Sequence, residues 1–455
     1  MNSMQGAGCS LKQFVRYVVP SVAAMLLFSL YTVIDAIFVA KGAGPEAMTA
    51  VNISLPFIST LSGFSVLLSM GTATLVAFAR GREDKEEADG LFSQTVAVIV
   101  LMSGTVTVLV ALFAGELAAF LGAGPLTIDD ATTYLRIVSL FSICFILSYC
   151  LEVMVKVDDS PYMATVGVAA SFVINIGLSY LFVIRFGWGV TGAAWSTGLA
   201  QVASLIIFLA YFFSKRAKLK IRRFTPRPRM LLRSFPLGVA DCSVEMIIAF
   251  LTFLYNHILL AYFGESYQTI YAVMAYVSLF VFMVMQGVAQ GMMHLVSFHA
   301  GKGESKIGWG YFRMSLLSGL SLGVFFAGLC QLAPEALCGL LLPNGSPLFQ
   351  QAVAALRVFS LSFLFVGVNI SIAGYLTAVE KPAASISLAL GRGFLFAPIA
   401  LGICAFLFGG RFLWFGALLG ESACVVVSLL VLRRYRRRDL LGLMARETGA
   451  APAKG

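Results

Sequence analysis

The sequence predicts an all-α integral membrane protein of twelve transmembrane helices, built as two six-helix lobes related by a pseudo-two-fold axis along the membrane normal. Three observations predict this fold: an apolar composition, twelve long apolar stretches and an internal repeat. Hydrophobic residues make up 59% of the 455 residues and charged residues only 12%, about half the charged share of soluble domains. This composition is typical of proteins that cross a membrane several times.

Each of the twelve stretches contains about 18 or more mostly apolar residues, enough for a helix to cross the hydrocarbon core. The runs are continuous rather than alternating, which excludes a transmembrane β-barrel. They lie at 14–40, 51–79, 91–113, 132–156, 162–184, 190–213, 236–262, 270–299, 308–330, 352–376, 384–407 and 412–432.

The second half of the chain repeats the first at a nearly constant offset in residue number. Equivalent positions include Gly71 and Gly291, Gly81 and Gly301, Phe92 and Phe312, and Pro161 and Pro382. Six spans are an even number, so both halves enter the membrane from the same side. Two lobes related by an axis along the membrane normal are a common architecture of secondary transporters.

The repeat and the charge pattern predict four segments. Residues 1–213 form an N-terminal six-helix lobe and residues 236–432 a C-terminal one. A basic cytoplasmic linker covers 214–235, and a basic cytoplasmic tail covers 433–455. We expect the tail after Arg438 to lack regular structure.

The net charge of +10 is a topology signal rather than a nucleic-acid signal. With the N-terminus placed in the cytoplasm, the inner connections carry 25 Lys and Arg and the outer connections three. Such a positive-inside bias places both termini in the cytoplasm. The basic residues then face anionic lipid headgroups, and no nucleic-acid partner is expected.

Metal and enzyme chemistry are not indicated. The eight cysteines show no CxxC or metal-ligand spacing, and most fall within apolar spans, where small apolar packing is their ordinary role. No His/Asp cluster typical of an intramembrane transferase is present, and neither is a channel filter. We therefore expect no cofactor and no enzyme activity.

The first span carries a carboxylate, Asp35, six residues before Lys41. An acid in hydrocarbon costs roughly 2.5–3.5 kcal/mol on insertion scales, so its presence needs a reason. Pro20 lies four turns earlier and can bend the same helix. An acid and a proline on one gating helix predict a proton switch. The alternative is an Asp that faces an aqueous cleft and stays ionised.

Polar residues of the fifth and sixth spans can gather around this acid. Asn175 and Ser179 are one turn apart in the fifth span, and Thr197 and Gln201 lie in the sixth. Together with Asp35 they could hold a proton or a small cation. Ordinary interhelical hydrogen bonds are the alternative interpretation.

The second half carries a different polar set. Asp241 and Glu245 lie one turn apart in the seventh span, and Asn256 takes the repeat position of Asp35. We regard these residues as a candidate substrate or second cation site. Arg392 and Glu421 fall near mid-membrane and can form an ion pair, with a structural or a functional role.

These residues converge on one family. The chain resembles multidrug and toxic compound extrusion (MATE) transporters from Arg16 to about Arg438. The segments that carry the resemblance are VPSVAAMLLFSLYTVIDAIFVAKGAG, GTATLVAFARGREDKEEA, NIGLSYLFVIRFGWGVTGAA, FPLGVADCSVEMIIAFLTFLYNHIL and MQGVAQGMMHLVSFHAGKGE.

The resemblance implies two six-helix lobes and export of organic cations or drugs in exchange for H⁺ or Na⁺. Asp35 matches the coupling acid of the family, with Asn175 and Thr197 at surrounding positions. Family members often carry an acid one turn after the fifth-span Asn, where this chain has Ser179. Glu245 resembles the first of two acids used by another subgroup, but the tenth span has no acid, so the coupling ion stays open.

The resemblance also implies cationic amphipathic small molecules as substrates, membrane lipids as partners, a monomer, and the inner membrane of a bacterium as the location. The alternative within the same superfamily is a flippase for a lipid-linked or amphipathic substrate. Flippases of this architecture usually have additional spans and cationic cavities, which argues against that alternative.

Overall fold

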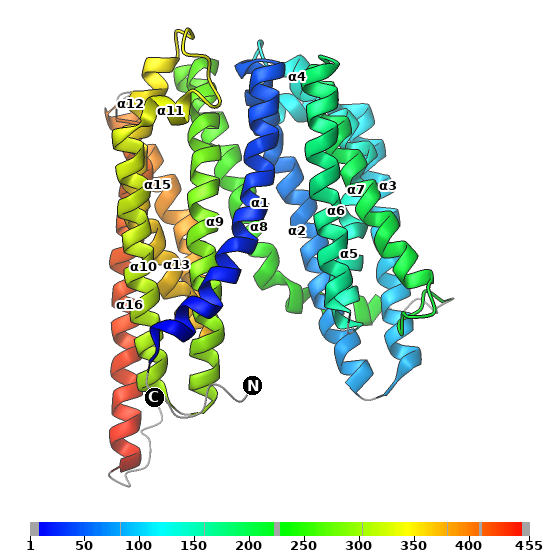
Figure 1. Ribbon diagram of the computed structural model, residues 1–455, viewed down its shortest axis with the longest axis vertical. Coiled ribbons are helices and arrows are strands. Elements are labelled where there is room, and N and C mark those ends of the chain that lie inside the picture. The colour runs from blue at the N-terminus through cyan, green and yellow to red at the C-terminus, as the bar shows by residue number, and fades with distance from the viewer. Residues whose placement is uncertain are drawn as a thin grey trace. The chain divides into compact units, whose positions relative to one another are not determined.

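The structure is a computed structural model and describes residues 9–222 and 228–447, except for Arg82, Asp159, Gly303, Glu380 and residues 409–411. Every regular element in the described residues is a helix (Figure 1). Ten helices are long and apolar enough to cross a membrane, and α4 (Ile128–Leu140) and α5 (Ser142–Val157), bent by 51° at their junction, add an eleventh when counted as one span. α1 (Leu11–Gly42) corresponds to the first predicted span.

The first half continues with α2 and α3. A glycine precedes α2, and an aspartate precedes α3. Gly44 has a φ of +102°, a conformation that favours glycine and ends α1. The Asp84 side chain accepts a hydrogen bond from the Glu87 N–H (2.9 Å) and caps α3. The elements are α2 (Pro45–Gly81), α3 (Lys85–Phe120), α4, α5, α6 (Pro161–Ser179), the π-helix η2 (Tyr180–Arg185) and α7 (Gly189–Phe213).

The second half repeats this order. Gly264, the repeat equivalent of Gly44, also has a positive φ (+85°) between its two helices. The elements are α8 (Pro228–Phe263), α9 (Glu265–Gly301), α10 (Ser305–Leu332), α11 (Pro334–Cys338), α12 (Phe349–Phe359), η3 (Ser360–Ser362), α13 (Phe363–Ala378), α14 (Pro382–Leu390), η4 (Gly391–Phe396), α15 (Ala397–Ile403), η5 (Cys404–Phe408) and α16 (Phe415–Glu447). The helices thus match the twelve predicted spans.

One contact joins equivalent positions of the two halves. The hydroxyl of Thr49 on α2 donates to the hydroxyl of Thr269 on α9 at 3.0 Å, and the two residues are 220 positions apart. Equivalent residues touch each other where a two-fold axis passes between them. This contact agrees with the repeat register read from the sequence.

Contacts divide the chain into two compact units. Unit 1 comprises Met1–Leu30, Met274–Cys338 and Gln350–Gly455, and unit 2 comprises Tyr31–Val273 and Gly339–Phe349. The core of unit 1 includes the buried residues Tyr311 and Leu376, and that of unit 2 includes Phe92 and Phe208. Two of the boundaries fall inside α1 and α9, two lie at 338/339 and 349/350, and none lies in the linker.

Closely packed glycines explain why the boundaries fall there. In unit 1, a Cβ added to Gly291 of α9 would lie 2.6 Å from the Cα of Val18 on α1. In unit 2, a Cβ added to Gly71 of α2 would meet the backbone of Ser234 on α8. Gly71 and Gly291 are repeat equivalents, and glycine lets helix backbones approach closely. The early part of each half's first helix therefore packs with helices of the other half.

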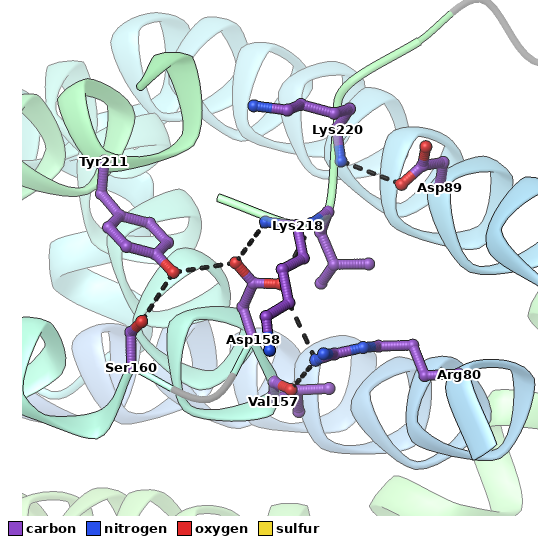
Figure 2. A network of polar contacts seen from close by, with 9 residues as sticks. Arg80, Asp89, Val157, Asp158, Ser160, Tyr211, Lys218 and Lys220 are labelled. Carbon is purple, nitrogen blue, oxygen red and sulfur yellow. Dashed lines mark hydrogen bonds and ion pairs between the residues drawn. The ribbon is translucent and has the colours of Figure 1, made fainter. Parts of the chain in front are cut away.

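A buried acid holds the connection that follows α7 (Figure 2). The side chain of Asp158 is fully buried. It accepts hydrogen bonds from the backbone N–H groups of Lys218 (2.9 Å) and Leu219 (3.0 Å). The Tyr211 hydroxyl donates to it at 2.8 Å, and Arg80 forms an ion pair with it at 3.7 Å.

Asp89 on α3 fixes the next residues of the same connection. It accepts a hydrogen bond from the Lys220 N–H (2.9 Å) and forms an ion pair with Arg222 (3.2 Å). Ala217 and Leu219 are buried between these contacts. The first part of the predicted linker is therefore bound to unit 2 rather than solvated as a tether.

Two boundaries differ from the sequence prediction. α8 begins at Pro228, so the last part of the predicted linker 214–235 is helical, because proline is favoured in the first helical turn and Met, Leu and Arg favour helix. α16 extends to Glu447, and the expectation of an irregular tail after Arg438 is wrong up to that residue. Leu, Met, Arg and Glu are strong helix formers there. Residues 448–455 lie outside the described part.

Candidate functional site

Asp35 lies on the part of α1 that belongs to unit 2 and is half-buried. Pro20 lies about four turns earlier, roughly 22 Å along the helix. α1 is helical through Pro20, whose nitrogen has no hydrogen to donate to the Arg16 carbonyl. That Pro20 allows this helix to bend stays a prediction.

A chain of two serine hydroxyls begins at Asp35. Ser179, the last residue of α6, donates to Oδ1 of Asp35 at 2.6 Å. Its oxygen lies 2.7 Å from the hydroxyl of Ser196 on α7, which lies 2.9 Å from the Ala193 carbonyl. Both serines are fully buried. The π-helix η2 begins directly after Ser179, and such widened turns are frequent at functional sites.

This chain of hydrogen bonds has two complete arrangements, because each hydroxyl has one hydrogen. When Asp35 is ionised, Ser179 donates to the carboxylate and Ser196 donates to Ser179. When Asp35 is protonated, its carboxyl donates to Ser179, Ser179 donates to Ser196, and Ser196 donates to the Ala193 carbonyl. The gain or loss of one proton reverses the chain without displacing any heavy atom.

A second polar pair joins the same two helices. The Asn175 amide nitrogen donates to the Thr197 hydroxyl at 3.5 Å, and both residues are buried. Within the described residues, the amide oxygen of Asn175 has no hydrogen-bond partner. A buried polar atom without a partner costs about 1–3 kcal/mol. A donor or a cation that reached this oxygen would remove that cost.

Two of the three residues predicted for a second site lie at different levels of one helix. Glu245 and Asn256 both lie on α8, but about three turns separate them, roughly 16 Å along the helix. Asn256 is fully buried, and neither of its amide atoms has a partner in the described residues. Glu245 is half-buried. The side chain of Asp241 lies outside the part of the structure that is described.

Arg392 and Glu421 form the ion pair that the sequence suggested, within unit 1. The Arg392 guanidinium contacts the Glu421 carboxylate at 2.7 and 2.8 Å and lies over the ring of Phe282 at 5.4 Å. Asn369 donates to the other carboxylate oxygen at 2.7 Å, and Ser428 donates to Asn369 at 3.2 Å. The carboxylate is therefore fully occupied by partners of the protein itself.

Comparison with known proteins shows which proteins the chain resembles. The family model MatE matches residues 20–181. Multidrug export protein MepA of Staphylococcus aureus (strain MRSA252) is 25% identical over 441 residues, with 94% of each chain covered. MepA of Staphylococcus saprophyticus is 23% identical over 437 residues, again with 94% of each chain covered.

Solved structures show the same fold. An inward-facing multidrug resistance MATE family transporter of the MOP superfamily has a TM-score of 0.83 at 18% identity, covering 89% of this chain and 94% of that one. An outward-facing structure of such a transporter has a TM-score of 0.71 at 19% identity, with coverages of 93% and 95%. The chain is thus similar to MATE transporters over nearly its whole length and shares their fold.

The solved structures confirm the prediction of an all-α two-lobe fold. In the described residues, no group of three or more His, Cys, Asp or Glu side chains is placed to hold a metal ion. The polar centre of unit 2 contains one carboxylate, Asp35, with the hydroxyls of Ser179 and Ser196 and the Asn175–Thr197 pair on the same two helices.

Sequence reasoning missed Ser196 and Asn369. Ser196 directly precedes Thr197, and a run of two hydroxyl residues in an apolar span was the available signal. Which of the two faces α1 depends on the rotation of α7 about its axis. Asn369 stands in the tenth span, where a neutral amide gives no charge signal.

Proposed function

We propose that this protein is a secondary active antiporter of the MATE family that exports organic cations or other drugs in exchange for protons entering through Asp35. The reversible hydroxyl chain from Asp35 through Ser179 and Ser196 is the observation that carries this proposal. A group that alternates between two charge states must keep its neighbours hydrogen-bonded in both. The chain from Asp35 to the Ala193 carbonyl meets that requirement.

Protons suit this arrangement better than Na⁺. Asp35 is the one carboxylate of the polar centre, and Ser179 takes the place where family members often have a second acid. Asn175 directs its amide nitrogen to Thr197 rather than to the carboxylate. A sodium site needs several oxygen ligands around one point, whereas a proton needs one acceptor. Coupling to Na⁺ is the alternative that the experiment below distinguishes.

One titrating carboxylate implies one proton per transport cycle. A proton that crosses the membrane releases roughly 2.3 kcal/mol per 100 mV. A monovalent cation that leaves against the same potential consumes this electrical work. Exchange of one for one is therefore electrically neutral, and the pH gradient supplies the driving force, about tenfold in concentration per pH unit.

Further expectations belong to the same proposal. Residues 1–213 and 236–432 act as the two lobes that alternate access, with 214–235 as the cytoplasmic linker and 433–455 as the cytoplasmic tail. The protein functions as a monomer in a bacterial inner membrane, with both termini in the cytoplasm. Glu245, Asp241 and Asn256 contribute to substrate or cation binding from α8. MepA, to which the chain is similar, is named a multidrug export protein.

Everted membrane vesicles test the coupling ion directly. Uptake of a fluorescent cationic dye is followed with an imposed pH gradient, with an imposed Na⁺ gradient, and with the potential clamped by valinomycin and K⁺. We expect the pH gradient alone to drive uptake, at a rate that the clamp does not change. Uptake driven by Na⁺ at uniform pH would assign Na⁺ coupling, and uptake without any gradient would contradict antiport.

A further inference from the structure

The last two spans separate at one end and close at the other. The first part of α16, remote from Arg434, packs against α15. A Cβ added to Gly416 or Gly420 of α16 would lie 3.1 Å from the Cα of Leu401 or Ala397. Gly416-x₃-Gly420 thus permits close helix contact there. Toward Arg434, α14 and α16 enclose a cavity of about 500 Å³ between them.

The walls of this groove are apolar and one end is cationic. The π-helix η4, which widens the helix locally, begins at Gly391 on one wall. The Ser387 hydroxyl is occupied by the Ala383 carbonyl at 2.8 Å. The main apolar residues of the lining are Leu388, Leu395, Phe396, Val427 and Val431, and Arg434 and Tyr435 line the end.

The position of Arg434 and Tyr435 in the sequence indicates where the cationic end of the groove lies relative to the membrane. Lys381 directly precedes α14, and Arg433 and Arg434 lie where α16 leaves the apolar stretch. The start of α14 and this part of α16 therefore belong to the side predicted to be cytoplasmic. With the predicted topology, the cationic end of the groove lies near the cytoplasmic headgroups. Arg434 is exposed, and no carboxylate of the described residues forms an ion pair with it.

The first half fills the equivalent place with protein. Tyr211 corresponds to Tyr435 at the spacing that also relates Gly192 to Gly416. The Tyr211 hydroxyl bonds to Asp158 and Ser160, each at 2.8 Å, and the bound linker crosses beside them (Figure 2). Phe208 packs onto Gly167 and closes α6 against α7.

Of these groups, the described residues of the second half keep the tyrosine, Tyr435, and lack the acid, the bound linker and the phenylalanine. Val379 corresponds to Asp158 at the offset that relates Pro161 to Pro382. α16 continues as a helix to Glu447, so none of the described residues after Tyr435 forms an extended strap across the groove. Leu388 and Leu432 take the positions of Gly167 and Phe208. An apolar groove with an arginine and a tyrosine at its mouth remains.

We propose that this groove binds one anionic phospholipid, with an acyl chain between α14 and α16 and the headgroup phosphate on Arg434 and the Tyr435 hydroxyl. Basic pockets between transmembrane helices on the cytoplasmic side bind anionic headgroups. The positive charge of Arg434 at the mouth of the groove favours a lipid with net negative charge over a zwitterionic one. The site is independent of the coupling site at Asp35.

Native mass spectrometry of the full-length protein tests this site. Purified protein is incubated with equal amounts of dioleoylphosphatidylglycerol and dioleoylphosphatidylcholine, and bound lipids are counted. We expect phosphatidylglycerol to be preferred in the wild type. Arg434→Gln should lower that preference about fivefold, because one arginine contributes about 1 kcal/mol near an anionic surface. Arg433→Gln, which removes an exposed arginine outside the lining, should leave it unchanged.

A variant that fills the groove distinguishes the contribution of the acyl chain to lipid binding from that of the headgroup. Ala384→Phe should reduce binding of both lipids while Arg434 is intact, and Ser387→Phe replaces it if Ala384→Phe is not monodisperse. Glycerol 3-phosphate at the same concentration should not displace phosphatidylglycerol. Four results would each overturn the proposal. The lipid preference could be unchanged in Arg434→Gln, or it could fall equally in Arg433→Gln. The groove-filling variant could bind lipid fully, or glycerol 3-phosphate could displace phosphatidylglycerol.

Discussion

At the scale of single residues, the polar centre of unit 2 depends on one carboxylate and its hydrogen-bond donors. Asp35 is held at 2.6 Å by Ser179, and the fully buried Ser196 completes the chain to the backbone of α7. In unit 1, by contrast, Glu421 is paired with a permanently charged arginine. Because the protein itself supplies partners to both oxygens of Glu421, we propose that coupling takes place at Asp35.

Asp35→Asn keeps the size and hydrogen-bonding capacity of the side chain but cannot gain or lose a proton. We expect dye uptake in everted vesicles to fall to that of vesicles without the protein, while dye binding to the purified variant persists. Asp129→Asn, at an exposed acid in the first turn of α4, is the matched control and should transport normally. Concentrative uptake by Asp35→Asn would place coupling elsewhere, with Glu245 as the next residue to test.

Ser179→Ala removes the hydrogen bond to Asp35 and leaves the helix intact. Hydrogen bonds to charged groups contribute about 1.5–3 kcal/mol, so we expect gradient-driven uptake to fall tenfold or more. Ser179→Thr retains the hydroxyl and should restore most of the rate. Initial rates at matched expression measure the effect, and equal rates for Ser179→Ala and wild type would show that the hydroxyl chain does not serve coupling.

At the scale of elements, the first helix of each half packs through glycines against a helix of the other half. Gly291 of α9 contacts the backbone of α1 in unit 1, and Gly71 of α2 contacts the backbone of α8 in unit 2. These crossings involve backbone atoms on both sides, and backbone cannot move aside as a flexible side chain can. The contacts are therefore sensitive to a single added methyl group.

Gly291→Ala should destabilise unit 1, because the new Cβ would meet the Cα of Val18 and the carbonyl of Tyr17. Overpacking of this kind costs about 1–3 kcal/mol, and we expect a lower thermal midpoint in detergent. Gly328→Ala on α10, where no atom lies within 4 Å of the added Cβ, is the control. It should keep or slightly raise the midpoint, because alanine favours helix over glycine. Equal midpoints for both variants would contradict the tight crossing.

At the scale of the whole molecule, twelve spans and a strong charge asymmetry predict a single orientation in the membrane. The connection after α7 carries Arg216, and the connection between α11 and α12 carries Asn344; both residues are exposed. By the positive-inside rule they lie on opposite sides.

Cysteines introduced at Arg216 and Asn344, in a background without the native cysteines, test that orientation. In intact cells a membrane-impermeant maleimide should label the cysteine at 344 and not the one at 216, and permeabilised cells should show both. Labelling of both sites in intact cells, or of 216 alone, would overturn the predicted topology.

Much of the element order followed from the sequence because its signals are local. Hydropathy located the spans, and the repeat predicted equivalent positions in both halves, as the turns at Gly44 and Gly264 show. The limits of α8 and α16 were missed because hydropathy marks the apolar stretch, whereas helix propensity continues past it. Asp158 and Asp89 gave no sequence signal of the linker that they bind, because their partners are backbone N–H groups far away along the chain.

The sequence by itself determined that this protein crosses a membrane twelve times as a repeated six-helix unit, and that the first helix of the first half carries one acid, Asp35. Those properties depend on residue type and on spacing along the chain. Only the tertiary structure decided that Ser196 rather than Thr197 continues the chain from Asp35, that the early part of α1 packs on α9, and that Glu421 is occupied by Arg392. The physical reason is that such contacts depend on how each helix is rotated about its axis and on how closely backbones approach, which packing fixes between residues far apart in sequence.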